Sequence, residues 1–176
     1  SIYRFFVDYE GKELKTFISS IILFLVITSF TASYVLMDAL PSILDLVFPS
    51  IPSTQYDIFN LAIIIAVLNI FQGVNMAVVR MREEAKKFMV ISISLLIISI
   101  LITIVEVVLL EKGINGMVEA MLISAILSFI TYTFFNRKYF SFSVNLKYVK
   151  APLLFSLPLI INALSSYIFM YSDRII

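Results

Sequence analysis

The sequence predicts an all-α membrane protein, a polytopic helix bundle with spans at about residues 16–37, 58–79, 88–110, 114–135 and 152–176. Hydrophobic residues make up 61% of the chain and charged residues only 14%, with a mean hydropathy of +1.02. Such a chain has too little polar surface to cover a core in water. Each apolar run is long enough to cross the hydrocarbon of a bilayer, which takes about 20 helical residues. Backbone groups in lipid must be satisfied within the segment, so unbroken runs indicate helices rather than barrel strands.

The placement of charge supports the same order of spans. Basic residues gather before the first span, between the second and third, and between the fourth and fifth, whereas the remaining loops are mainly acidic. Since loops rich in Lys and Arg stay in the cytoplasm, we expect the N-terminal end of the chain to be cytoplasmic. The basic groups are Arg4, Lys12 and Lys15; Arg80, Arg82, Lys86 and Lys87; Arg137, Lys138, Lys147 and Lys150; the opposite loops carry Asp38, Asp45, Asp57 and Glu111, with Lys112 as their one basic residue.

The connections have distinct expected structures. Pro41, Pro49 and Pro52 predict that residues 38–57 form no continuous helix and lie along the outer membrane interface. The short glycine-containing turn at 111–116 predicts an antiparallel hairpin of the third and fourth spans. Residues 136–150 carry both aromatic and basic side chains, the mixture expected of an interfacial linker. This linker predicts two domains, a partial first transmembrane lobe at 1–147 and the first helix of a second lobe at 148–176.

Several kinds of chemistry have no visible apparatus. The chain has no Cys and no His, which removes disulfides, thiolate metal sites and the commonest general base. It shows no close acidic pair in a loop of the kind with which a membrane glycosyltransferase holds a divalent metal, and no Gly-rich phosphate loop. We therefore expect no enzyme activity, no catalytic residue, no metal, no cofactor and no nucleic-acid partner.

Polar residues recur at helical spacing inside the spans, where they usually face a bundle interior or a wet cavity. Four helices carry such a stripe, and together these stripes predict a hydrophilic chamber. The stripes are Asn69, Gln72, Gly73 and Arg80 in the second span; Ser92, Ser99, Thr103 and Glu106 in the third; Ser124, Ser128 and Thr131 in the fourth; and Asn162, Ser166 and Asp173 in the last, where Pro158 should kink the helix.

A simpler interpretation stands beside this one. Ser, Thr and Gly in membrane helices most often permit close packing, so only the amides and charges favour a binding site. Glu106 lies near the outer end of its span, where simple solvation explains it equally well. Arg80 lies at the inner boundary and is also explained as an interfacial anchor.

Three segments resemble bacterial polysaccharide flippases of the multidrug/oligosaccharidyl-lipid/polysaccharide exporter superfamily. Leu154-Phe155-Ser156-Leu157-Pro158-Leu159-Ile160, followed by Ser165-Ser166 and Ser172-Asp173-Arg174, resembles the start of their seventh helix. Tyr3-Arg4-Phe5-Phe6 to Tyr9-Glu10 resembles the loop after their second helix, and the basic segment from Arg80 to Phe88 resembles the loop between their fourth and fifth. The resemblance covers about helices 3 to 7. We accordingly expect the chain, which begins without Met and ends within an apolar run, to be part of a longer protein.

The resemblance implies a transporter of two six-helix lobes that form a V and work by alternating access. Its members move undecaprenyl-diphosphate-linked oligosaccharide repeat units from the inner to the outer leaflet of the cytoplasmic membrane of bacteria or archaea, for O-antigen, capsule or exopolysaccharide. Expected partners are this lipid-linked substrate, the bilayer, and a polysaccharide polymerase and chain-length regulator. Arg4, Arg80 and Arg174 are candidates for the diphosphate, and Asn69, Gln72, Asn162 and Asp173 for the rest of the substrate.

The chain departs from some relatives because the centres of its spans contain no Arg or Lys. Three alternatives stay open. A cation-coupled drug or metabolite exporter of the same superfamily would use an intramembrane acid, for which Glu106 and Asp173 are the candidates. A membrane polysaccharide polymerase would need a large outer loop or an embedded His. A purely structural subunit would leave the polar stripes unexplained.

Overall fold

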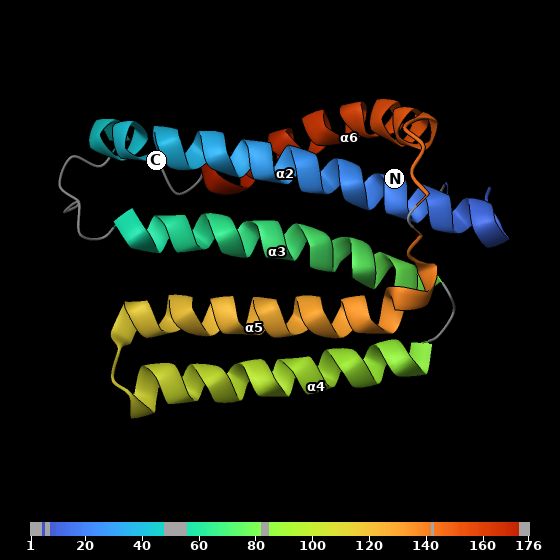
Figure 1. The fold of residues 1–176 in the computed structure, drawn as a ribbon. Coiled ribbons are helices and arrows are strands. Elements are labelled where there is room, and N and C mark those ends of the chain that lie inside the picture. Colours follow the sequence, from blue (N-terminus) through green and yellow to red (C-terminus); the bar gives the residue numbers. More distant parts are fainter. Residues whose placement is uncertain (1–4, 6–7, 48–55, 82–84, 142, 173–176) are drawn as a thin grey trace. The chain divides into compact units, whose positions relative to one another are not determined.

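The computed structural model describes residues 5, 8–47, 56–81, 85–141 and 143–172 (Figure 1). In this part of the chain there is no strand, and the predicted all-α class is confirmed. The elements in chain order are α2 (Gly11–Val47), α3 (Tyr56–Met81), α4 (Ala85–Thr103), the π-helix η2 (Ile104–Leu109), α5 (Gly113–Asn136), the 3-10 helix η3 (Arg137–Tyr139) and α6 (Lys147–Ser172).

The five predicted spans correspond to five helices that are long and apolar enough to cross a membrane. The chain is a multi-pass membrane helix bundle. Each helix begins before the predicted span, and α2, α3 and α5 also end beyond it. The last helix, for example, begins at Lys147 and not at Pro152, and includes both Pro152 and Pro158.

One expectation about the outer loop is wrong. Helix α2 continues through Pro41 to Val47, so this proline does not end the helix. Proline removes one backbone hydrogen bond and crowds the preceding turn, but membrane helices tolerate it where neighbouring groups satisfy the freed carbonyl. At 37 residues α2 is about 55 Å long, well beyond the hydrocarbon thickness. Pro49 and Pro52 lie outside the described residues.

The chain divides into two compact units, one of residues 1–21 and 139–176 and one of residues 22–138. The predicted lobe boundary after residue 147 stays a prediction.

In the second unit α5 packs on both α3 and α4 and lies between them (Figure 1). Where α2 ends and α3 begins, the Tyr56 hydroxyl donates a hydrogen bond to Asp45.

The buried face of α5 consists mainly of small side chains. Without a hydrophobic driving force between helices in lipid, small residues favour association because they let two backbones approach closely. On the neighbouring helix α4 most large side chains are exposed, with Ile91 as its one buried described residue, although Phe88 and Leu95 pack against the buried cluster around Ile91. The buried residues of α5 are Gly116, Ala120, Ala125, Ser128, Tyr132 and Asn136.

Two asparagines join α3 to α5 at one end of this face. The Asn136 amide donates to the backbone oxygen of Asn75 at 2.8 Å and to its side-chain oxygen at 3.1 Å. Asn75 in turn donates to the carbonyl of Phe71 and to the hydroxyl of Thr133. Both asparagines are buried. Polar side chains of this kind hold membrane helices together because their alternative in hydrocarbon is an unsatisfied group.

The hairpin of α4 and α5 is confirmed, although its turn is shorter than expected. Gly113 has φ of +59° and begins α5, so Gly116 belongs to the helix. Before the turn, α4 widens into the π-helix η2, in which the amide of Leu110 donates to the carbonyl of Val105, five residues earlier. Such π-helical turns are rare and recur at functional sites. Nothing in the composition of 104–109 predicts this one.

In the first unit, the start of α2 holds the segment that precedes α6. Ser19 Oγ accepts a hydrogen bond from the amide of Ser141 at 2.8 Å, and Ser20 Oγ accepts one from the amide of Asn145 at 2.9 Å. The Tyr148 ring packs edge-on against Tyr9 and Phe17. Ser141 and Asn145 lie outside regular secondary structure, and these two serine hydroxyls satisfy their backbone amides.

Gly116→Ala tests the close approach of α5 to η2. A Cβ atom at Gly116 would lie 2.6 Å from the carbonyl oxygen of Glu106, which is backbone and cannot move aside easily. We expect a loss of about 1–3 kcal/mol in unfolding free energy, measured by denaturant titration in detergent micelles. Gly73→Ala is the matched control, since its Cβ would meet nothing within 4 Å; equal losses for both variants would contradict the packing described.

Asn136→Ala tests the amide contact between α3 and α5. Because the substitution removes two hydrogen bonds and leaves Asn75 with fewer partners, we expect a loss of about 1–2 kcal/mol in unfolding free energy in the same titration. Asn115→Ala, an exposed amide at the other end of the same helix, should cost less than about 0.5 kcal/mol. A loss at Asn115 as large as that at Asn136 would argue against a specific contact.

Candidate functional site

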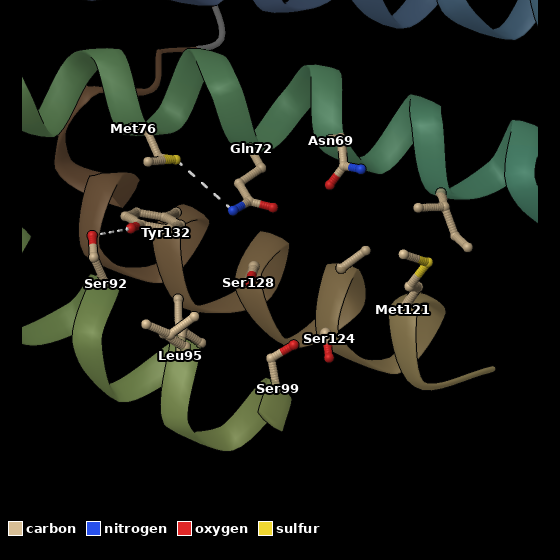
Figure 2. A pocket seen from close by; sticks show the side chains of 13 residues that line it. Asn69, Gln72, Met76, Ser92, Leu95, Ser99, Met121, Ser124, Ser128 and Tyr132 are labelled. Atoms are coloured by element: carbon tan, nitrogen blue, oxygen red, sulfur yellow. Dashed lines mark hydrogen bonds between the residues drawn. The ribbon is translucent and has the colours of Figure 1, made fainter. Parts of the chain in front are cut away.

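A polar cleft of about 380 Å³ lies among α3, α4 and α5 (Figure 2). All of it belongs to one unit, residues 22–138. Seven of its lining side chains are polar and none is charged. The polar residues are Asn69, Gln72, Ser92, Ser99, Ser124, Ser128 and Tyr132, and the remainder of the lining is Ile65, Met76, Leu95, Leu96, Met121 and Ala125.

Helix α3 supplies both amides of the cleft. Asn69 and Gln72 are three residues apart, so they project from one face of the helix, and Figure 2 shows both pointing toward α5. The Gln72 amide lies 3.8 Å from the sulfur of Met76, a weak hydrogen bond one turn further along. An amide carries two donors and two acceptor lone pairs, so both residues retain unused hydrogen-bonding capacity.

Helices α4 and α5 supply the hydroxyls. Ser92 and Ser99 are seven residues apart on α4, and Ser124, Ser128 and Tyr132 follow one another at intervals of four on α5. These spacings bring each set to one helix face. Ser92 Oγ and the Tyr132 hydroxyl are 3.0 Å apart and share a hydrogen bond, which closes one end of the cleft (Figure 2).

Some hydroxyls in the spans are satisfied within their own helix. Thr28, Thr31 and Ser166 donate to the carbonyl four residues earlier in their own helix, at 2.8, 2.8 and 2.9 Å. Within the described part of the chain, Asn69, Ser99, Ser124 and Ser128 make no side-chain hydrogen bond. The Ser124 hydroxyl oxygen is buried without a hydrogen-bond partner, and since an unpaired polar group in an apolar setting is costly, it favours a polar occupant.

The structure brings together part of each predicted stripe. Asn69 and Gln72 line the cleft with Ser92, Ser99, Ser124 and Ser128, whereas Thr103 and Thr131 do not. The hydroxyl of Thr103 donates instead to the carbonyl of Ser99.

Other predicted residues lie elsewhere. Arg80 is exposed, with its guanidinium carbon 4.6 Å from the centroid of the Phe88 ring. It is eight residues beyond Gln72 on α3, about 12 Å along the helix axis, and does not line the cleft. Asn162 is exposed on α6, in the other unit. Arg4, Asp173 and Arg174 lie outside the described residues.

Glu106 belongs to a three-residue charge cluster at the opposite end of α4. Its carboxylate pairs with the amine of Lys112 at 2.6 Å, and the same amine pairs with Glu119 at 2.5 Å. The π-helical turn brings Glu106 to face the start of α5. Because Lys112 donates hydrogen bonds to the carboxylates of Glu106 and, to a smaller extent, Glu119, its ammonium form is stabilised and the pKa of Lys112 is raised above its ordinary value.

Sequence reasoning missed three features of this region. Tyr132 continues the spacing of Ser124 and Ser128 by four more residues, so the periodicity contained a signal for it. Asn75 and Asn136 are 61 residues apart, and no local pattern indicates their pairing. The clustering of Lys112 with two carboxylates depends on the unpredicted η2. Among the described residues, no group of three His, Cys, Asp or Glu side chains is placed to hold a metal.

A comparison with known protein families gives no match for this chain, and neither a curated protein nor a solved structure matches it. What can be argued about its function therefore rests on the cleft, on the placement of its charges and on the resemblance of its motifs.

The raised pKa of Lys112 predicts a pH-dependent stability. The pKa of Lys112 is higher in the folded than in the unfolded chain, so its protonated form stabilises the fold. This stabilisation is fully present below about pH 10.4, the pKa of an unperturbed lysine, and is lost as the pH rises through the pKa of Lys112 in the folded chain. The unfolding temperature of the wild type should therefore exceed that of Lys112→Gln at about pH 8, and the difference should shrink toward about pH 12.

The exposed Lys150 provides the control for this measurement. Lys150→Gln should leave the unfolding temperature nearly unchanged, because an exposed charge without a close partner contributes little. A constant difference between wild type and Lys112→Gln over the whole pH range would contradict the ion pairs.

Proposed function

We propose that the chain is part of a flippase that moves lipid-linked oligosaccharide repeat units, of the undecaprenyl-diphosphate type, across the cytoplasmic membrane for surface polysaccharide synthesis. The observation that carries the proposal is the uncharged polar cleft within an otherwise apolar set of helices. Its amides and hydroxyls, four of them without hydrogen-bond partners, fit a hydroxyl-rich and neutral ligand such as a sugar.

The composition of the cleft also favours sugar over other cargo. A site for a cationic drug would be expected to hold a carboxylate, and a site for a free phosphate would hold an arginine or lysine. The cleft lining has neither. Its leucines, methionines and isoleucine suit the apolar faces of sugar rings, while the amides of Asn69 and Gln72 can donate and accept at once.

The diphosphate would be held outside this cleft. Arg4, Arg80 and Arg174 stay our candidates for it, because a guanidinium binds phosphate oxygens in pairs. Arg80 is the member of this set whose position is described, and it lies at the end of α3 opposite Asp57, the end that the charge pattern predicts to be cytoplasmic. A headgroup entering from that leaflet would meet Arg80 before its sugars reach the cleft.

In this proposal transport follows from alternating access of two lobes around a polar passage while the polyprenyl tail stays in lipid. The same superfamily contains cation-coupled exporters, but no observation on the described residues favours that function here. Glu106, one of the two acids suited to coupling, is already paired with Lys112. A repeat-unit polymerase is favoured by no described feature either.

The experiment uses the full-length protein, expressed in cells deleted for its gene. Deletion should cause lipid-linked repeat units to accumulate on the cytoplasmic leaflet and surface polysaccharide to disappear, and the wild type should reverse both effects. Asn69→Leu/Gln72→Leu should export at least about tenfold less, because removal of several polar contacts to one ligand costs more than about 1.4 kcal/mol. Leaflet-specific labelling of the repeat unit measures the rate.

Matched substitutions outside the cleft separate binding from stability. Asn115→Leu changes an exposed amide, and Ser94→Ala changes an exposed hydroxyl of α4 that does not line the cleft. Both should export like the wild type, whereas Ser92→Ala should reduce export. Normal export by the cleft variants, or unchanged polysaccharide in the deletion strain, would overturn the proposal.

A further inference from the structure

A second hollow, of about 240 Å³, lies between the start of α4 and the end of α5. It belongs to the same unit as the polar cleft but lies at the end of the helices where the chain reverses from α3 to α4. Its polar lining consists of Lys87, Arg137 and Lys138, and its apolar lining of Val79, Ile91, Phe134 and Phe135. The transport cycle proposed above does not use it.

The lining carries three cations and no acid. The described acidic residues of α3, α4, η2 and α5 lie at the far ends of those helices, as Asp57 and Glu106 illustrate. Glu83 and Glu84 belong to the connection between α3 and α4, outside the described residues. Arg137 and Lys138 therefore place positive charge beside apolar rings, at the level where span ends meet the membrane interface.

Arg137 and Lys138 are the central cations of this site. The guanidinium carbon of Arg137 lies 4.5 Å from the centroid of the Phe134 ring, a cation–π contact. Within the described part of the chain neither residue pairs with a carboxylate. A guanidinium carries five N–H donors in a planar fork, which suits two oxygens of one phosphate.

An apolar groove of about 250 Å³ adjoins this hollow and shares three of its residues, Lys87, Ile91 and Phe135. Val90 and Lys86 complete the groove. The side chains of Val90 and Phe135 are 59% and 44% exposed, so they face the surroundings of the helix pair, which in a membrane are lipid. The cationic hollow thus continues into the apolar groove along α4 and α5.

We propose that this combined surface is a binding site for an anionic phospholipid, with its phosphate on Arg137 and Lys138 and an acyl chain along Ile91, Val90 and Phe135. Basic pockets between membrane helices bind such headgroups because several cations meet one phosphate where water is scarce. A soluble phosphate would satisfy the cations but leave the groove unused. The apolar continuation is what selects a lipid.

The test uses the purified full-length protein in nanodiscs of phosphatidylcholine that contain a small, varied fraction of phosphatidylglycerol. Native mass spectrometry then counts the phosphatidylglycerol molecules retained and gives an apparent affinity. The wild type should retain phosphatidylglycerol, and Arg137→Gln/Lys138→Gln should lower the affinity at least about tenfold, since each cation near a lipid phosphate contributes appreciably. Lys138→Arg, which keeps the positive charge and leaves Arg137 in place, should bind within about threefold of the wild type.

Lys147→Gln/Lys150→Gln is the control, because it removes the same charge at exposed positions outside this hollow. It should retain phosphatidylglycerol like the wild type. If Arg137→Gln/Lys138→Gln and Lys147→Gln/Lys150→Gln lost the same affinity for phosphatidylglycerol, the effect would be general electrostatic attraction, and the proposed site would be overturned. Unchanged binding by Arg137→Gln/Lys138→Gln, or full displacement of the lipid by an equal amount of inorganic phosphate, would also overturn it. The unfolding temperature in pure phosphatidylcholine, expected to be the same for all variants, shows that a loss reflects binding and not folding.

Discussion

The structure of the second unit depends on the close packing of α5 against its neighbours. In lipid, burial of apolar side chains between helices gains little over their contact with acyl chains, so shape and polar contacts must provide the association. Gly116 lets α5 approach η2 closely, and at the other end of α5 the Asn136 amide donates a hydrogen bond to Asn75. Between these two fixed ends, small side chains such as Ser128 leave room, and this room is the polar cleft.

The same arrangement explains why the cleft is polar but uncharged. A charge at the centre of a span is costly unless it is paired, and this chain places its charges at the span ends. Amides and hydroxyls impose a smaller cost, and several of them can share a ligand or bond to one another, as Ser92 and Tyr132 do. The middle of the helices therefore suits neutral, hydrogen-bonding groups, and the ends suit phosphates.

The two ends of the helix group differ in how their charges are used. At one end, the ammonium of Lys112 pairs with the carboxylates of Glu106 and Glu119, and Glu106 lies on the π-helical turn. At the other end, Arg137 is stacked on an aromatic ring and faces no described carboxylate. The first arrangement stabilises a turn between two helices, whereas the second leaves positive charge available to an anionic group.

The sequence by itself determined the fold class, the number of spans and their approximate positions, because in lipid every backbone group must be satisfied within its own helix and the apolar runs are long. It also identified Asn69, Gln72 and four of the serines, since polar residues stand out against such runs. It did not predict the passage of α2 through Pro41, the π-helix around Glu106, or the pairing of Asn75 with Asn136. These depend on contacts between residues distant in the chain, or on local backbone changes that such contacts stabilise. Only the tertiary structure decided that three of the stripes meet in one cleft, because helical periodicity gives each polar face but not its rotation toward a neighbour.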